Sequence, residues 1–113
     1  MAFALAQTET FKSTVKVNVK TKNGAWREET FTAIFKRTDE DGRERLLGLK
    51  NIELLREVMT GWEGMTVSED DKTAVPFSPE NFEAFLKLTG AVREAALQYI
   101  NDNFNVKESR AKN

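Results

Sequence analysis

The sequence contains no cysteine and no histidine. Without cysteine the chain forms no disulfide, carries no thiolate nucleophile and offers no sulfur ligand to a metal. Without histidine it lacks the commonest general base and the commonest metal ligand. It also has no G-x-G-x-x-G or Walker sequence that would bind nucleotide phosphates. These absences favour a protein-binding role over catalysis, so we expect no enzyme activity and no cofactor.

The acidic residues do not suggest a metal site either. Asp39-Glu40-Asp41-Gly42 superficially resembles a calcium loop, but it lacks the ligand spacing and the terminal glutamate of an EF-hand. A second acidic run covers residues 69–71. We interpret both runs as solvated loops and expect no bound metal.

Neither sign of charge dominates the chain, which has 17 basic and 18 acidic residues and a formal charge of -1. Nucleic-acid-binding domains usually carry a clustered basic excess, so we expect no nucleic-acid partner. No apolar run approaches the roughly 18 residues of a membrane span. Residues 1–7 lack the basic start of a secretory signal. We therefore expect a cytoplasmic protein that does not bind a membrane.

The overall composition is typical of one globular domain. The chain has 113 residues, of which 40% are hydrophobic and 31% charged. This length and balance suit one domain with a single modest core. We predict a single domain over residues 1–113, with residues 1–10 and 105–113 as flexible arms.

Two alternating runs predict an antiparallel β-hairpin over residues 11–37, because apolar residues of one parity mark half-buried strands. These apolar residues are Phe11, Val15, Val17 and Val19 in the first run and Phe31, Ala33 and Phe35 in the second. A two-residue loop, Asn23-Gly24, would leave apolar residues on both faces of the hairpin. A three-residue loop, residues 22–24 with Gly24 left-handed, pairs Val15 with Phe31 and gives one apolar face. We predict the three-residue loop.

The remaining periodic segments predict three helices, over residues 43–60, 79–89 and 91–103. The second has the clearest start, because Ser78 suits the N-cap position and Pro79 the first helical position. Phe77 and Phe82 have the spacing of a hydrophobic staple. The predicted fold is therefore α+β, with the hairpin packed on the three helices.

Four apolar residues are candidates for a partner-binding surface. Trp62 follows the predicted first helix, and tryptophan is enriched at binding hot spots, but the stronger interpretation is that Trp62 seals the core beneath the loop. Leu46 and Leu49 fall on the polar side of the same predicted helix. They either flank the core or form part of a contact surface. We expect Trp62 and the loop from it to Phe77 to lie near the partner surface, together with Leu46 and Leu49. The other tryptophan, Trp26, lies near the hairpin turn, where stacking under Lys20 accounts for it without a partner.

Several short segments follow one another in a recognisable order. They are Phe31–Arg37, Leu54–Met65, Val75–Asn81, Leu88–Ala96 and Ala111–Asn113. In order and spacing they resemble the small tail assembly chaperones of long-tailed bacteriophages, over most of the chain from about residue 11. The acidic loop departs from the pattern, since it reads Glu69-Asp70-Asp71-Lys72 where an Asp-Gly turn is expected.

The resemblance implies a protein that binds the long tape-measure protein while tail-tube subunits assemble around it. Such chaperones act in the cytoplasm of the bacterial host, are absent from the mature virion and tend to self-associate. They often occur in two lengths, the longer made by ribosomal frameshifting. Two alternatives remain: a structural head–tail or tail component of a phage, and a small protein-binding adaptor unrelated to phages.

Overall fold

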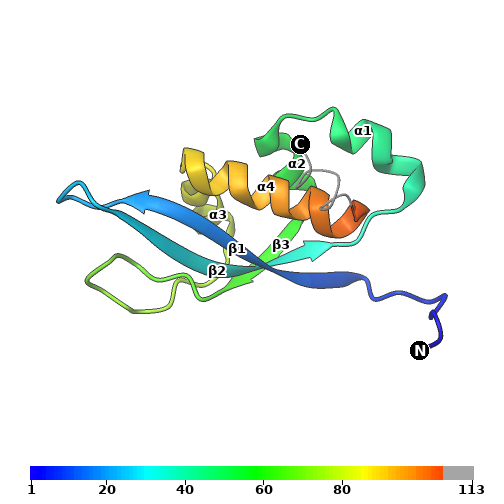
Figure 1. The fold of residues 1–113 in the computed structure, drawn as a ribbon, viewed down its shortest axis with the longest axis horizontal. Coiled ribbons are helices and arrows are strands. Elements are labelled where there is room, and N and C mark those ends of the chain that lie inside the picture. The colour runs from blue at the N-terminus through cyan, green and yellow to red at the C-terminus, as the bar shows by residue number, and fades with distance from the viewer. Residues whose placement is uncertain (106–113) are drawn as a thin grey trace.

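A computed structural model describes residues 1–105 of the chain and shows an α+β fold, as the sequence predicts (Figure 1). The elements in chain order are β1 (Thr10–Lys20), β2 (Trp26–Lys36), the 3-10 turn η1 (Glu40–Gly42), α1 (Arg43–Leu47), α2 (Asn51–Val58), β3 (Met59–Glu63), α3 (Pro79–Phe85) and α4 (Thr89–Phe104). The strands form one antiparallel sheet in the order β1-β2-β3. The predicted flexible segment 105–113 lies outside the described residues, except for Asn105.

The hairpin has the predicted register. Val15 lies opposite Phe31, and the pairing runs without interruption from Thr10 with Lys36 to Lys20 with Trp26. The Thr21 N–H donates to the Ala25 carbonyl at 2.7 Å, which closes a loop of residues 22–24. Gly24 has φ +91°, the left-handed conformation that this loop requires.

The predicted helix 43–60 is wrong in its extent. It is interrupted after α1, where Gly48 has a poor helix propensity, and α2 begins at Asn51. Its last predicted residues instead start β3, and Trp62, which the prediction placed after a helix, lies opposite Ala33 in the sheet. Met59 is 4% and Trp62 7% exposed in β3, and for Met59 this tertiary gain overrides the local helical pattern.

The last two helices exist but have different bounds from those predicted. Ser78 caps α3 by accepting a hydrogen bond from the Asn81 N–H at 3.2 Å, as expected, but the helix ends at Phe85 and not at residue 89. The final helix, α4, begins at Thr89, so Gly90 lies inside its first turn and does not precede it. Gly90 faces Val17 of β1, where an added Cβ would make an ordinary van der Waals contact at 3.9 Å.

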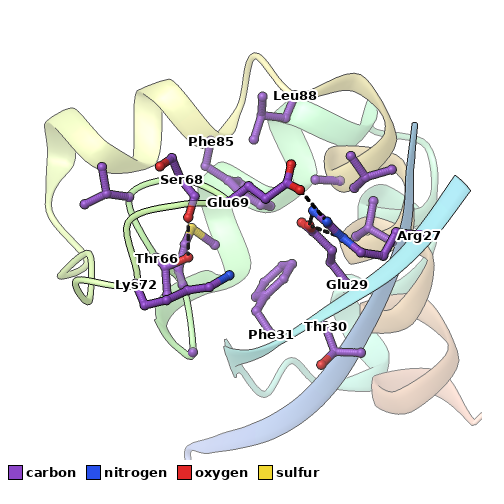
Figure 2. A pocket seen from close by; sticks show the side chains of 16 residues that line it. Arg27, Glu29, Thr30, Phe31, Thr66, Ser68, Glu69, Lys72, Phe85 and Leu88 are labelled. Carbon is purple, nitrogen blue, oxygen red and sulfur yellow. Dashed lines mark hydrogen bonds and ion pairs between the residues drawn. The ribbon is translucent and has the colours of Figure 1, made fainter. Parts of the chain in front are cut away.

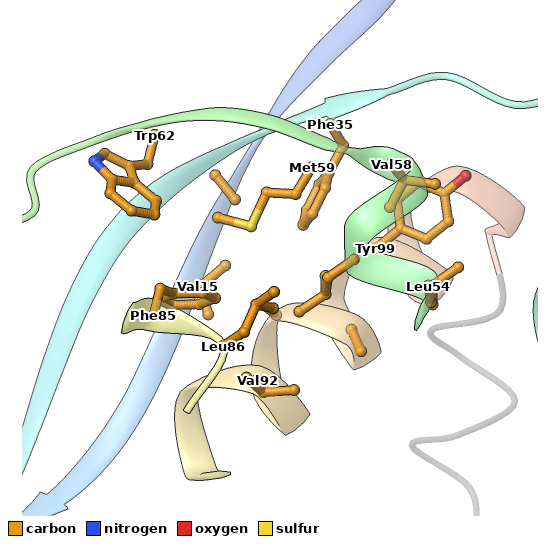
Figure 3. Close-up of a cluster of buried hydrophobic side chains, with 14 of the residues drawn as sticks. Val15, Phe35, Leu54, Val58, Met59, Trp62, Phe85, Leu86, Val92 and Tyr99 are labelled. Atoms are coloured by element: carbon orange, nitrogen blue, oxygen red, sulfur yellow. The ribbon is translucent and has the colours of Figure 1, made fainter. Parts of the chain in front are cut away.

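The helices cover one face of the sheet, with α4 lying across β1 and α2 beside α4 (Figure 1). The inner face and the helices enclose the core (Figure 3). Its largest fully buried side chains are Val15, Phe35, Leu54, Leu55, Val58 and Tyr99. The opposite face of β1 exposes Lys12, Lys16 and Lys20 to solvent. In residues 1–105, no helix has the length and apolar character needed to cross a bilayer.

Candidate functional site

A groove of about 610 Å³ opens between the hairpin and the long loop that follows β3 (Figure 2). Its walls come from the hairpin, from the loop, and from the end of α3 and the start of α4. The lining residues are Val17, Val19, Arg27, Glu29, Thr30, Phe31, Gly64, Met65, Thr66, Val67, Ser68, Glu69, Lys72, Phe85, Leu88 and Ala91. The name "groove" below refers to this set.

The groove has an apolar floor and a polar rim. Phe31 packs edge-on against the buried Phe85, with ring centroids 5.5 Å apart. Beside them, Val67 is 57% and Leu88 56% exposed, so both are open to solvent in the groove. Apolar side chains exposed together inside a hollow are typical of a binding surface, because an isolated soluble domain gains by covering them.

The groove exists because β3 leaves the sheet early. It pairs with β2 only from Thr32 to Phe35, although β2 extends back to Trp26. After Glu63 the chain turns at Gly64, whose φ of +81° is a conformation that L side chains rarely adopt. Residues 26–31 of β2 therefore have β1 on one side and the groove on the other.

The loop of residues 64–76 is held as a small ladder. Thr66 and Ala74 form an antiparallel bridge, and the Val75 N–H donates to the Met65 carbonyl at 2.8 Å. Near the tip, the Asp71 carboxylate accepts a hydrogen bond from the Thr73 N–H at 3.0 Å. Hydrogen bonds from Thr73 lower the pKa of Asp71, since they favour its charged form.

Arg27 joins the loop to the hairpin at the rim. Its guanidinium donates to the Glu69 carboxylate at 2.7 Å and also to Glu29, the neighbour on its own strand face (Figure 2). The hydrogen bond from Arg27 lowers the pKa of Glu69, and those from Arg27 to both carboxylates raise the pKa of Arg27. All three side chains are substantially exposed, with 39% exposure for Arg27 and 49% for Glu69, so water screens the contact.

The structure places the predicted partner-binding residues in two regions. Trp62 is buried beneath the loop, where Phe77 packs against it with ring centroids 4.8 Å apart. Leu46 lies in the core at 2% exposure, and Leu49 is partly buried beside the core. None of the four lines the groove, although Trp62 and Phe77 support the loop that forms its wall.

The sequence predicted that the loop from Trp62 to Phe77 lies near a partner surface, and this loop forms one wall of the groove, but it singled out neither Val67 nor Leu88 as a contact residue. Leu88 precedes α4, and Val67 lies in a polar loop, so neither belongs to a periodic stripe. An isolated apolar residue next to a helix start or in a loop is too common to be a signal on its own. Their significance depends on their meeting in space.

Among residues 1–105, no group of three or more acidic, histidine or cysteine side chains is arranged to hold a metal ion. Comparisons of the chain with protein-family models, with curated proteins and with solved structures give no match.

Proposed function

We propose that this protein is a tail assembly chaperone of a long-tailed bacteriophage, and that its groove holds an apolar helical segment of the tape-measure protein. The tape-measure protein is long and helical, and it exposes apolar surface until tail-tube subunits enclose it. A groove with an apolar floor suits such a segment, because one apolar stripe of a helix fits a hollow of this kind.

The observation that carries the proposal is where the resembling segments lie. The segment Leu54–Met65 contributes Gly64 and Met65 to the groove, and Leu88–Ala96 contributes Leu88 and Ala91. The segment Val75–Asn81 anchors the loop wall, because the Val75 carbonyl accepts the hydrogen bond of the Trp62 indole. Segments far apart in the chain, which together resemble the chaperone family, thus surround one surface.

The rim suits a temporary holder. Of the four charged residues that line the groove, Arg27, Glu29 and Glu69 are already paired with one another, so a partner gains contact mainly with the apolar floor. Apolar contact over a small area gives modest affinity, since much of the gain offsets the loss of translational freedom. Modest affinity lets tail-tube subunits displace the chaperone from the tape-measure protein.

The test is co-expression with the longest helical protein encoded beside this one, followed by purification through a tag on the chaperone. We expect the partner to stay soluble and to co-purify. Leu88→Asp should abolish co-purification, because it places a charge on the floor of the groove. Leu88 is the N-cap of α4, where aspartate is favoured, so this variant should keep its fold.

Ile52→Asp is the matched control. Ile52 is 41% exposed at the start of α2 and lies outside the groove, and aspartate is also tolerated near a helix N-terminus. This variant should bind like the wild type. If the partner stays insoluble and the wild-type protein elutes alone, the proposal fails. Recovery of the protein in purified virions would favour a structural tail component instead.

A further inference from the structure

A second hollow, of about 560 Å³, opens between β1 and the first turns of α4. It is lined by residues 16–18 of β1, by Trp26, and by Gly90, Arg93 and Glu94 of α4. It shares with the groove only Val17, which is 9% exposed. Trp26 is 67% exposed. A tryptophan open to water beside a hollow is suited to anchor a partner, because covering its ring gains free energy.

This hollow lies at a free sheet edge. β1 is the outer strand of the order β1-β2-β3, so among residues 1–105 no strand pairs on its other side. The backbone hydrogen bonds that flank the hairpin involve Thr21 at one end and Glu9 at the other, both odd-numbered. In an antiparallel pair this alternation continues, so the even-numbered residues of β1 direct their N–H and C=O groups outward. Such an edge accepts an added strand, and the end of the hairpin projects beyond the helices (Figure 1).

The free edge of β1 is basic. Lys12, Lys16 and Lys20 occupy every fourth residue on its exposed outer face, with a spacing of about 13 Å along the strand. Arg93 adds a cation beside the hollow, where its side chain is 71% exposed and pairs with Glu94 at 3.1 Å. The edge therefore attracts a strand that carries negative charge.

Two of these lysines are open to a new partner. Among residues 1–105, neither Lys16 nor Lys20 forms an ion pair with a carboxylate, whereas Lys12 pairs with Glu63 at 2.9 Å. Lys20 lies over the Trp26 ring at 5.5 Å. Glu28 lies on β2, one strand farther from the edge.

A second copy of β1 does not suit this edge. In an antiparallel pair centred on Lys16, each Lys12 would lie opposite Lys20 of the other copy. Like charges directly opposite one another destabilise a strand pair, and lysines on edge strands protect against such pairing. An acidic strand turns the same contacts into favourable ones.

We propose that the free edge of β1 binds an extended acidic segment of another protein, which adds as a strand beside residues 12–20. Carboxylates at alternate positions of the segment lie beside Lys16 and Lys20 on the outer face. An apolar side chain between them enters the hollow that Val17 and Trp26 line. This edge is separate from the edge of β2 that adjoins the groove, so the proposal holds whether or not the groove binds the tape-measure protein.

The probe is a fluorescent synthetic peptide with blocked ends, Glu-Val-Glu-Phe-Glu-Val-Glu, titrated with the full chain and followed by fluorescence anisotropy. The wild type should bind it saturably, and added salt should weaken the binding by screening. Lys16→Glu should weaken it about tenfold, because a favourable cross-strand pair becomes a repulsive one. Lys72→Glu is the matched control, since it makes the same charge change at an exposed position outside the hollow, and it should bind like the wild type.

Gly90→Gln tests the hollow. A Cβ at Gly90 meets only Val17, at 3.9 Å, and glutamine is a better helix former than glycine, so the variant should keep its fold. Its longer side chain occupies the hollow and should weaken peptide binding. Gly90→Ala is the control, because it leaves most of the hollow open and should bind like the wild type.

Hydrogen exchange distinguishes strand addition from attraction by charge alone. The amides of Lys16 and Asn18 point outward and should exchange quickly in the free protein, and the peptide should slow them. The proposal is overturned if the wild type does not bind the peptide, if Lys16→Glu and Lys72→Glu bind it equally, or if these two amides stay unprotected at saturation. Tighter binding of a single-stranded oligodeoxythymidine than of the peptide would also overturn it, because the lysines would then serve a nucleic acid.

Discussion

The indole N–H of Trp62 donates a hydrogen bond to the carbonyl of Val75 at 2.7 Å. Trp62 stands at the end of β3 and Val75 at the far end of the loop, so this bond ties together the two ends of the segment that forms the groove wall. The ring packs against Phe77 and against Phe85, with ring centroids 4.8 Å and 5.7 Å apart. Figure 3 shows Trp62 and Phe85 at the edge of the core. One side chain thus belongs to the core and also fixes the loop.

Trp62→Phe should lower the free energy of unfolding by about 1 to 3 kcal/mol, because it leaves the Val75 carbonyl without its donor. It should also raise amide hydrogen exchange in residues 65–75. Trp26→Phe is the control, since Trp26 is 67% exposed and stacks only under Lys20, and it should change stability by less than about 0.5 kcal/mol. Urea denaturation measures both. Equal effects of the two variants would contradict this account.

Leu46→Ser should lower the free energy of unfolding by at least about 3 kcal/mol, because it opens a cavity and buries a hydroxyl. Leu46 is 2% exposed, whereas its neighbour Leu47 is 41% exposed. Leu47→Ser should cost less than about 1 kcal/mol. Thermal unfolding of the two variants distinguishes a core position from a contact surface. A Leu46→Ser variant as stable as Leu47→Ser would mean that Leu46 belongs to the surface.

Tyr99 should make the protein less stable in alkaline solution. Burial raises the pKa of Tyr99 above its usual value of 10.0, despite the hydrogen bond with Thr38 that opposes the shift. Above pH 10 the unfolded chain loses this proton while the folded chain keeps it, so stability falls as pH rises. Because the chain has one tyrosine, absorbance of the tyrosinate reports this titration directly. Tyr99→Phe should remove the alkaline loss, and an unshifted titration would refute the prediction.

Acid should loosen the loop of the groove. The Arg27 hydrogen bond lowers the pKa of Glu69 below 4.5, so its contribution is present above pH 4.5 and is lost as pH falls through the lowered value. Hydrogen exchange of the Val67 amide, which donates to Thr73 at 3.0 Å, should increase toward pH 3 after correction for the intrinsic rate. Glu69→Gln should show raised exchange already at pH 6. A smaller pH dependence should remain, because the pKa of Asp71 is also lowered. No difference between the variant and the wild type at pH 6 would show that the pair does not hold the loop.

Local sequence patterns predicted the hairpin in detail. The alternation from Phe11 to Phe35 requires one apolar face, and only an odd loop ending in Gly24 provides it, so the register follows from side-chain parity. The start of α3 was also predicted from the sequence, because Ser78 and Pro79 stabilise the helix N-terminus within one helical turn. The stacking of Lys20 over Trp26 also follows from their pairing in this register.

Features that depend on distant partners were missed or misassigned. Met59 belongs to an apolar helical pattern and Trp62 follows the end of that pattern, yet both lie in β3 because an open edge of β2 lies beside them. In the predicted single straight helix, Leu46 falls on the polar side. In the structure the helix is interrupted at Gly48, so α1 has a different direction and Leu46 points into the core. The open edge of β2 left no signal in the sequence, because it results from where β3 departs.

The sequence by itself determined the strand register, the helix cap and the α+β class, because these depend on side-chain parity and on hydrogen bonds between near neighbours. Only the tertiary structure decided that β3 exists, that Leu46 and Trp62 are buried, and that Phe31, Val67 and Leu88 meet in one groove. Burial and groove shape depend on which segments pack together, and that packing is a sum over contacts between residues far apart in the chain.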